Sequence, residues 1–267
     1  MNFNEELRKE QIKWHASLKI DRSKTVHYPP VMLSIGETTL GQTTYPIPYG
    51  TYGNFSALVG GSKVGKSYFK SLIIASYIGG KAINYAIDFK SHREGEKVIL
   101  DFDTEQGEWH AQMGAKRVDT IVGETYENYY PFMLRELDYN ERVNFIEYCL
   151  YTKYKDKIGL IIIDGIADLV ADVNSLPESN EMIQKLMTWT SETKVHIIVV
   201  IHSNYKSNKA TGHLGSAIMK KAETICQLER ENDFTKVSFP FCRGFKLDEF
   251  CFKLDENGLP YTDKLDY

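Results

Sequence analysis

The stretch Gly60-Gly61-Ser62-Lys63-Val64-Gly65-Lys66-Ser67 matches the pattern G-x-x-x-x-G-K-[ST], which is the signature of a phosphate-binding loop. Glycines let such a loop curl so that its backbone N–H groups point at a β-phosphate, and the following helix adds the positive end of its dipole. In this pattern the Lys66 ammonium reaches the β- and γ-phosphates and the Ser67 hydroxyl is a ligand for Mg²⁺. We therefore predict that residues 60–67 and the adjoining Tyr68 bind nucleotide.

The residues on either side supply the context that this loop requires. The apolar run 55–59 predicts a buried strand before the loop. The apolar spacing in residues 68–78 predicts a helix after it, which ends at Gly79-Gly80. A coincidental glycine-rich turn would lack this strand and this helix.

The remaining pattern alternates strands with helices. Further strands are predicted at residues 98–102, 160–163, 197–201 and 224–228, and helices at 179–192 and 216–223. Asp138 and Glu141 have the spacing of a capping box that opens another helix. Apolar alternation on both sides of a polar turn at 243–248 predicts a C-terminal β-hairpin. The fold class is therefore α/β, with a mostly parallel central sheet flanked by helices and an antiparallel extension.

The N-terminal fifty residues are expected to form a helix and an extended arm, before an ATPase domain over 51–267. Residues 1–20 have the pattern of an amphipathic helix. Residues 21–50 are predicted to be loop-rich because Tyr28-Pro29-Pro30 and Pro46-Ile47-Pro48 act as breakers. The helix either docks on a neighbouring protomer or packs on its own domain, and the sequence favours neither.

Composition limits the classes of function. The chain has 267 residues, 42% hydrophobic and 25% charged content and a net charge of −4, so it is an ordinary globular protein that does not hold nucleic acid by bulk positive charge. It lacks a signal peptide and an apolar run of about 18 residues, which argues against a membrane. Its cysteines lack CxxC spacing, which favours a reduced, cytoplasmic protein; they are Cys149, Cys226, Cys242 and Cys251.

Two acidic positions complete the predicted site. Asp164 ends the apolar strand 160–163 and is the expected Mg²⁺ partner of the phosphate loop; the alternative is an Asp that caps the next helix. Hydrolysis also needs a carboxylate that orients and deprotonates the attacking water. Glu105, just beyond the strand 98–102, is the preferred candidate. Asp101 and Asp103 are rivals, but they lie inside the strand and are expected to point into the faces of the sheet.

The order of these motifs resembles that of RecA-like P-loop ATPases. The residues of these motifs are most similar to those of RepA-like and DnaB-like hexameric replicative helicase ATPases of phages, plasmids and mobile elements. The resemblance covers about residues 52–256. The resemblance implies a RecA-like core, Mg²⁺-dependent ATP hydrolysis with Glu105 as catalytic base, and DNA helicase activity in replication. It also implies a homo-oligomer, with a hexameric ring as the expected form, that binds single-stranded DNA and has a primase or loader protein as a further partner.

The same resemblance assigns roles to the end of the predicted strand 197–201 and to the segment after it. His202 matches the residue that senses the γ-phosphate, although a lone His is more often structural. Residues 205–213 match the polar, flexible loop that lines the channel of hexameric helicases. Lys206 and Lys209 are the candidates to neutralise DNA phosphates, with Tyr205 or His213 stacking or bonding. An ordinary solvated loop is the alternative.

Arg243, in the turn of the predicted hairpin, matches the arginine finger that DnaB-like motors extend into a neighbouring active site, with Lys246 as a helper. The family has a Lys two residues before the finger, whereas this chain has Phe241. A solvated Arg in a turn is the alternative.

Two classes of function follow. The first is a DNA-stimulated ring ATPase acting as a helicase, and the second is a RecA-like regulatory or assembly ATPase that binds proteins and does not translocate. The chain lacks the N-K-x-D motif of GTPases, the LSGGQ signature of transporter ATPases and the Arg-rich lid of small-molecule kinases.

Overall fold

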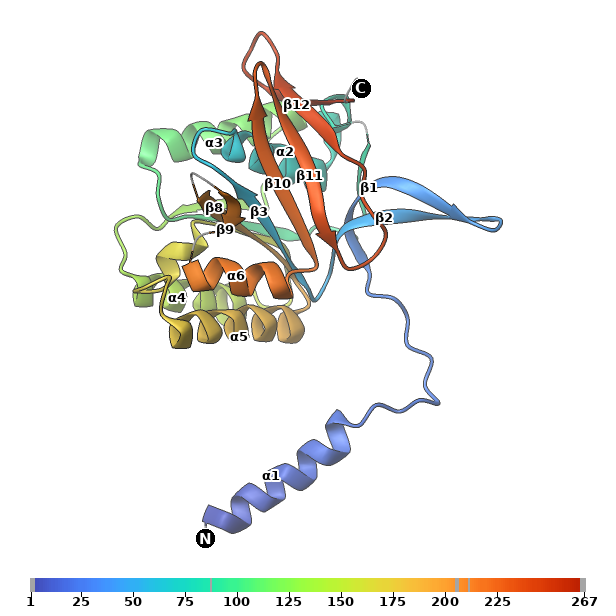
Figure 1. Cartoon of the computed structure of the whole chain (residues 1–267), viewed down its shortest axis with the longest axis vertical. Helices are drawn as coiled ribbons and strands as arrows, with labels where there is room; N and C mark the ends of the chain where they lie inside the picture. Colours follow the sequence, from blue (N-terminus) through green and yellow to red (C-terminus); the bar gives the residue numbers. More distant parts are fainter. Residues whose placement is uncertain (1–2, 87, 205–206, 211, 265–267) are drawn as a thin grey trace.

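The computed structural model describes residues 3–86, 88–204, 207–210 and 212–264, and a large twisted sheet runs through the middle of the molecule (Figure 1). Its strand order is β13-β12-β11-β10-β3-β8-β7-β5-β6, with β9 paired to β8. The strands from β10 to β6 run parallel, and β11, β12 and β13 continue the sheet antiparallel. The strands are β3 (Phe55–Gly60), β5 (Val98–Asp103), β6 (Tyr129–Met133), β7 (Ile158–Asp164), β8 (His196–Asn204), β9 (Ser207–Ala210), β10 (Thr224–Glu231), β11 (Phe234–Cys242), β12 (Phe250–Leu254) and β13 (Pro260–Asp263).

Helices cover both faces of this sheet, which confirms the predicted fold class. On one face α2 and α3 pack with the first apolar cluster, and on the other α4, α5 and α6 pack with the second. The predicted capping box is confirmed at the start of α4, where the Asp138 carboxylate accepts from the Glu141 N–H and the Glu141 carboxylate accepts from the Asp138 N–H. The helices are α2 (Lys66–Ile78), α3 (Glu108–Val122), α4 (Tyr139–Tyr148), α5 (Leu176–Thr193) and α6 (Gly212–Lys221), with short helical turns at Gly80–Asn84, Cys149–Lys153 and Ile166–Leu169.

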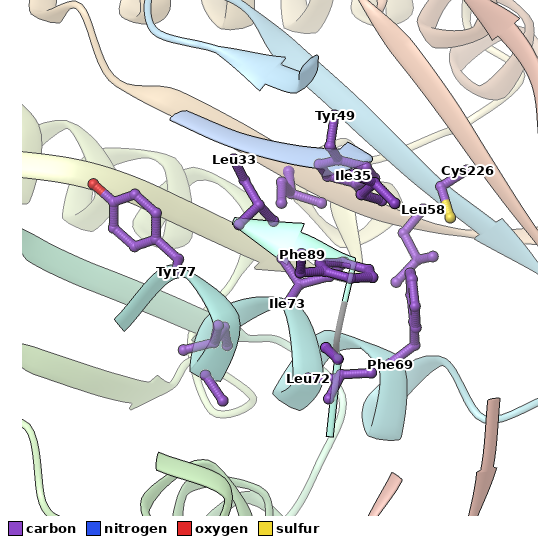
Figure 2. Packing of buried hydrophobic residues seen from close by; sticks show 14 of the residues in the cluster. Leu33, Ile35, Tyr49, Leu58, Phe69, Leu72, Ile73, Tyr77, Phe89 and Cys226 are labelled. Atoms are coloured by element: carbon purple, nitrogen blue, oxygen red, sulfur yellow. The ribbon is translucent and has the colours of Figure 1, made fainter. Parts of the chain in front are cut away.

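A second, smaller sheet corrects the expectation that residues 21–50 are loop-rich. β1 (Val31–Leu40) and β2 (Thr43–Thr51) form an antiparallel hairpin, and β4 (Phe89–Ser91) joins β1. Pro46 and Pro48 were predicted to break structure, but they lie in β2, which is an edge strand and tolerates a missing N–H. The hairpin packs over α2: in Figure 2, Leu33 and Ile35 of β1 lie over Ile73 of α2, and Phe89 of β4, the register partner of Ile35, belongs to the same buried apolar layer.

The parallel strands bring their carboxyl ends to one edge of the sheet. β3 and β5 are buried along their whole length, as expected of strands covered on both faces. Gly60 pairs with His202, and Asp103 pairs with Asp164. The polar residues that follow four apolar strands are therefore neighbours in space, and this edge holds the candidate site.

Helix α1 (Phe3–Leu18) forms where the sequence predicts a helix, but it stands apart from the rest of the chain at the end of an extended segment (Figure 1). Its apolar side chains Ile12, Trp14 and Leu18 are 71%, 50% and 76% exposed. These side chains are therefore not covered by the helix's own domain in this structure, which was one of the two alternatives that the sequence left open.

Candidate active site

A pocket of about 520 Å³ opens where the phosphate loop meets the carboxyl ends of β5, β7 and β8. The loop connects β3 to α2 and turns at Gly65, whose φ of +93° favours glycine. A Cβ at Gly65 would also lie 2.8 Å from Cζ of Phe252, so this close approach of loop and β12 needs a residue without a side chain. Of the predicted nucleotide-binding residues, the pocket is lined by Lys63, Gly65, Lys66, Ser67 and Tyr68.

Lys66 lies inside the curl of the loop. Its Nζ donates to the carbonyl oxygens of Gly60 at 2.9 Å and Gly61 at 2.7 Å. Burial lowers the pKa of Lys66 below its ordinary value, against the attraction of Asp164 and Glu105. Gly60 and Gly61 thus hold the ammonium through their carbonyls.

The other two predicted residues of the loop do not contact Lys66 in this way. The Val64 carbonyl accepts a hydrogen bond from the Thr235 hydroxyl, and Ser62 is exposed in the turn.

His202 joins two other predicted catalytic residues. Its Nδ1 lies 3.2 Å from Lys66 Nζ, and its Nε2 lies 3.2 Å from Glu105 Oε1. The hydrogen bond from His202 is the largest influence on Glu105 and holds the pKa of this carboxyl below its ordinary value, against the opposing effect of burial. Three strands therefore bring a cation, a carboxylate and an imidazole together at one edge of the sheet, as their sequence positions predict.

Ser67 and Asp164 are the candidate metal-side residues, and both line the pocket. A hydroxyl and a carboxylate are the hard oxygen donors that Mg²⁺ prefers. Within the part of the chain that the structure describes, no group of three or more His, Cys, Asp or Glu could hold a metal ion. Ser67 and Asp164 supply two oxygen donors of the type that suits Mg²⁺, and such an ion would need further oxygen ligands.

Lys70, a residue that the sequence analysis missed, forms ion pairs with the acidic residues of two neighbouring strands, β5 and β7. It is 6% exposed, and its Nζ lies 2.8 Å from Asp164 Oδ2, 3.2 Å from Asp101 Oδ1 and 3.6 Å from Asp103 Oδ2. Burial alone would lower the pKa of Lys70, but the attraction of the three carboxylates outweighs it and raises that pKa. Asp101 and Asp103 therefore face a buried ammonium, and this arrangement favours Glu105 over them as the base.

Strand β10 and the antiparallel extension form a wall of the pocket that the sequence analysis also missed. Arg230, Thr235, Phe252 and Leu254 line it from β10, β11 and β12. The Arg230 guanidinium donates to the Thr235 hydroxyl at 3.4 Å, and this hydroxyl donates to Val64 O at 2.9 Å. The wall is thus bonded to the phosphate loop and presents a cation to the nucleotide site.

Arg243 lies far from the pocket of its own chain. Its guanidinium donates to Asn54 Oδ1 at 3.3 Å and to the Lys221 carbonyl at 3.1 Å. Asn54 precedes β3 whereas the phosphate loop follows it, and these six strand residues span roughly 20 Å. The structure therefore does not bring Arg243 to the other predicted catalytic residues within one chain.

The predicted DNA-binding segment is only partly a loop. Ser207–Ala210 form β9, which pairs antiparallel with the end of β8 through Ser203↔Ala210 and Asn204↔Ser207. This corrects the expectation of an irregular loop over 205–213, and the backbone of Lys209 lies in the strand. Tyr205 and Lys206 lie outside the described residues. The alternation that marks a strand is too short here to be seen in the sequence.

Replacement of His202 by Ala tests its bond to Glu105. Because this bond lowers the pKa of Glu105, its loss should raise that pKa toward the ordinary value. The acid-side midpoint of a plot of kcat against pH should then move to higher pH. His27→Ala, in the exposed linker, is the control. An unchanged acid limb in a folded His202→Ala variant would contradict this coupling.

Comparisons with known proteins place the chain in a family. None of the helices in the described residues is both long and apolar enough to cross a membrane. A search of curated proteins finds no match. A family model described as AAA domain matches residues 47–208, more than half of the chain, including the phosphate loop, Glu105, Asp164 and His202. The chain therefore belongs to the AAA domain family and is a nucleotide-binding P-loop ATPase of the AAA and RecA-like class.

Proposed function

We propose that this chain is a Mg²⁺-dependent, ring-forming ATPase stimulated by single-stranded DNA, and acts as a helicase of a phage, plasmid or mobile element. The observation that carries the proposal is the position of His202. It contacts both Lys66 and Glu105, and its strand β8 leads directly into the segment with Lys206 and Lys209. One strand thus links the phosphate site to the candidate DNA contacts.

The chemistry follows from the residues in the pocket. Lys66 exchanges its bonds to the loop carbonyls for bonds to the β- and γ-phosphates. Ser67 and Asp164 would hold Mg²⁺, which would neutralise charge that develops on the phosphates. Glu105 orients a water and accepts its proton. His202, bonded to Glu105 and next to Lys66, senses whether the γ-phosphate is present.

Two features support assembly of several copies. Arg243 lies at the edge of the sheet opposite its own phosphate loop, so it can stabilise a transferring phosphoryl group only in another copy. Phe241 and Phe245 on either side of it are 59% and 41% exposed, which suits a contact surface. The exposed apolar residues of α1 suit a second contact between copies.

Assembly also reconciles DNA binding with the net charge of −4. One chain offers only Lys206 and Lys209 at the segment after β8. A ring repeats both cations around a central strand, and each phosphate neutralised releases counterions and strengthens binding. Affinity for DNA should therefore depend on oligomerisation and on ATP.

The proposal is tested by the ATPase rate with and without single-stranded DNA at several salt concentrations. We expect stimulation that weakens with salt and disappears in a Lys206→Ala/Lys209→Ala variant with an unchanged basal rate. A Lys155→Ala/Lys157→Ala variant, which removes two exposed cations elsewhere, should keep it. If no length of strand stimulates the enzyme or binds in a salt-sensitive way, the helicase proposal is wrong, and a non-translocating regulatory or assembly ATPase is favoured.

Arg243→Ala should lower turnover by about 10³-fold, the effect typical of an arginine finger. Arg243→Lys keeps the charge but not the planar fork, and should retain only part of the activity. An equimolar mixture of Arg243→Ala with Lys66→Ala should regain activity, because some interfaces then pair an intact finger with an intact phosphate loop. A mixture no more active than its components would contradict action between copies.

A further inference from the structure

The buried Lys70 is the feature that the proposed mechanism leaves unused. It lies on α2 one helical turn after Lys66, so the two ammonium groups belong to the same face of the helix. Lys66 points into the phosphate loop, whereas Lys70 points at the strand ends, with 7% of its side chain exposed. A buried charge is costly unless it is paired, so its contacts indicate what it does.

Those contacts reach the metal side of the site. The shortest, 2.8 Å from Lys70 Nζ, is to Asp164 Oδ2, and Asp164 also lines the nucleotide pocket with Ser67. The ion pair with Lys70 fixes the orientation of the Asp164 carboxylate, and so fixes how this carboxylate faces the nucleotide pocket. Groups that hold a metal ligand in this way tune its affinity for the metal.

The same ammonium reaches the turn that carries the candidate base. Lys70 Nζ lies 3.6 Å from Asp103 Oδ2. The other oxygen of this carboxylate, Oδ1, accepts from the backbone N–H of Glu105 at 3.0 Å and of Gln106 at 2.8 Å. The Asp103 carboxylate therefore links the Lys70 ammonium to the backbone of Glu105.

The third partner anchors the cluster to the rest of the sheet. Asp101 Oδ1 lies 3.2 Å from Lys70 Nζ, and Asp101 Oδ2 accepts from the Tyr129 hydroxyl at 3.0 Å. Asp101 does not line the nucleotide pocket. It is therefore the member of the cluster that can be changed with the least direct effect on nucleotide.

We propose that Lys70 is a positioning residue for ATP hydrolysis, which fixes the Asp164 carboxylate toward Mg²⁺ and, through Asp103, the turn that bears Glu105. This inference rests on the proposed roles of Asp164 and Glu105. A merely structural ion pair would stabilise the fold without setting the Mg²⁺ dependence of nucleotide binding.

The test separates these two roles with a charge-matched variant. Lys70→Met alone leaves the buried carboxylates of Asp101 and Asp103, and that of Asp164, without their cation and is expected to destabilise the fold. Lys70→Met/Asp101→Asn removes one positive and one negative charge, so the cluster keeps its net charge, but Asp164 loses its ion pair with Lys70. Asp101→Asn alone is the matched control, and Lys70→Arg is the conservative variant.

Two quantities are measured: the affinity for a fluorescent, non-hydrolysable ATP analogue as Mg²⁺ is titrated, and kcat at saturating Mg²⁺. In the double variant we expect the Mg²⁺ midpoint to rise and kcat to fall by about 10–100-fold each, as for other groups that hold a metal ligand. Binding of the analogue without Mg²⁺ should be unchanged. Asp101→Asn should stay near wild type, and Lys70→Arg should recover most of the loss.

Every outcome decides between the alternatives. A folded double variant with a wild-type midpoint and kcat overturns the inference, provided that Asp164→Asn shifts the midpoint. If Asp164→Asn shifts nothing either, the proposed metal role of Asp164 fails instead. If both the double variant and its Lys70→Gln/Asp101→Asn counterpart are unfolded in thermal melting, Lys70 is a structural residue and its positioning role is rejected.

Discussion

Replacement of Lys66 by Ala is expected to reduce ATP turnover by at least about 100-fold, the loss typical of removing one preorganised group that stabilises transition-state charge. In the structure the Lys66 ammonium is held by two loop carbonyls and lies next to His202. The other Lys of the loop, Lys63, is exposed. Lys63 and Arg230 line the same pocket, but neither follows the last glycine of the loop, so neither replaces it.

The measurement combines steady-state turnover with binding of a fluorescent ATP analogue. Both should fall in Lys66→Ala, because the side chain contacts phosphates in the ground state and in the transition state. Lys155→Ala, which removes an exposed Lys remote from the pocket, controls for the loss of one charge. Wild-type turnover in a folded Lys66→Ala variant would remove the phosphate-loop assignment and every mechanism built on it.

The sequence predicted the parallel sheet and the meeting of its strand ends well, for a physical reason. The buried strands are mostly apolar, and each ends in or leads into a stretch that carries polar residues. Parallel strands align these ends at one edge, so Lys66, Glu105 and His202 converge without any knowledge of loop geometry. Their catalytic roles stay predictions, which the variants above test.

The smaller sheet, β2-β1-β4, was missed because proline was weighted as a breaker. Pro46 and Pro48 would disrupt a central strand, but β2 has β1 as its only neighbour in the sheet order of the described residues, and an edge strand accommodates proline. Whether a strand lies at an edge depends on the tertiary arrangement. Local sequence does not carry that information.

Lys70 was missed although its signal is present. Ile99, Asp101 and Asp103 alternate with Leu100 and Phe102 along β5, so both carboxylates share the face that packs against α2. Two carboxylates on a buried face are costly unless they are paired, so a cation is expected on the helix that covers this face. Periodicity alone therefore predicts a basic residue on the inner face of α2.

Replacement of Glu105 by Gln is expected to slow hydrolysis by about 10²–10⁴-fold, the contribution typical of a general base. The amide has nearly the same shape as the carboxylate and keeps an oxygen that can accept from His202 Nε2. It cannot accept a proton from water at neutral pH. Nucleotide binding should therefore remain near wild type while kcat falls, which distinguishes this variant from Lys66→Ala.

Single-turnover hydrolysis and analogue binding are measured side by side, with Glu124→Gln as the control for loss of an exposed carboxylate. Asp101→Asn tests the rival carboxylate. The Asp101 carboxylate is bound by the Lys70 ammonium and the Tyr129 hydroxyl, and it does not line the nucleotide pocket. Its loss should therefore cost far less. If Asp101→Asn slows hydrolysis more than Glu105→Gln while both remain folded, the base lies inside β5 and the turn after that strand is not catalytic.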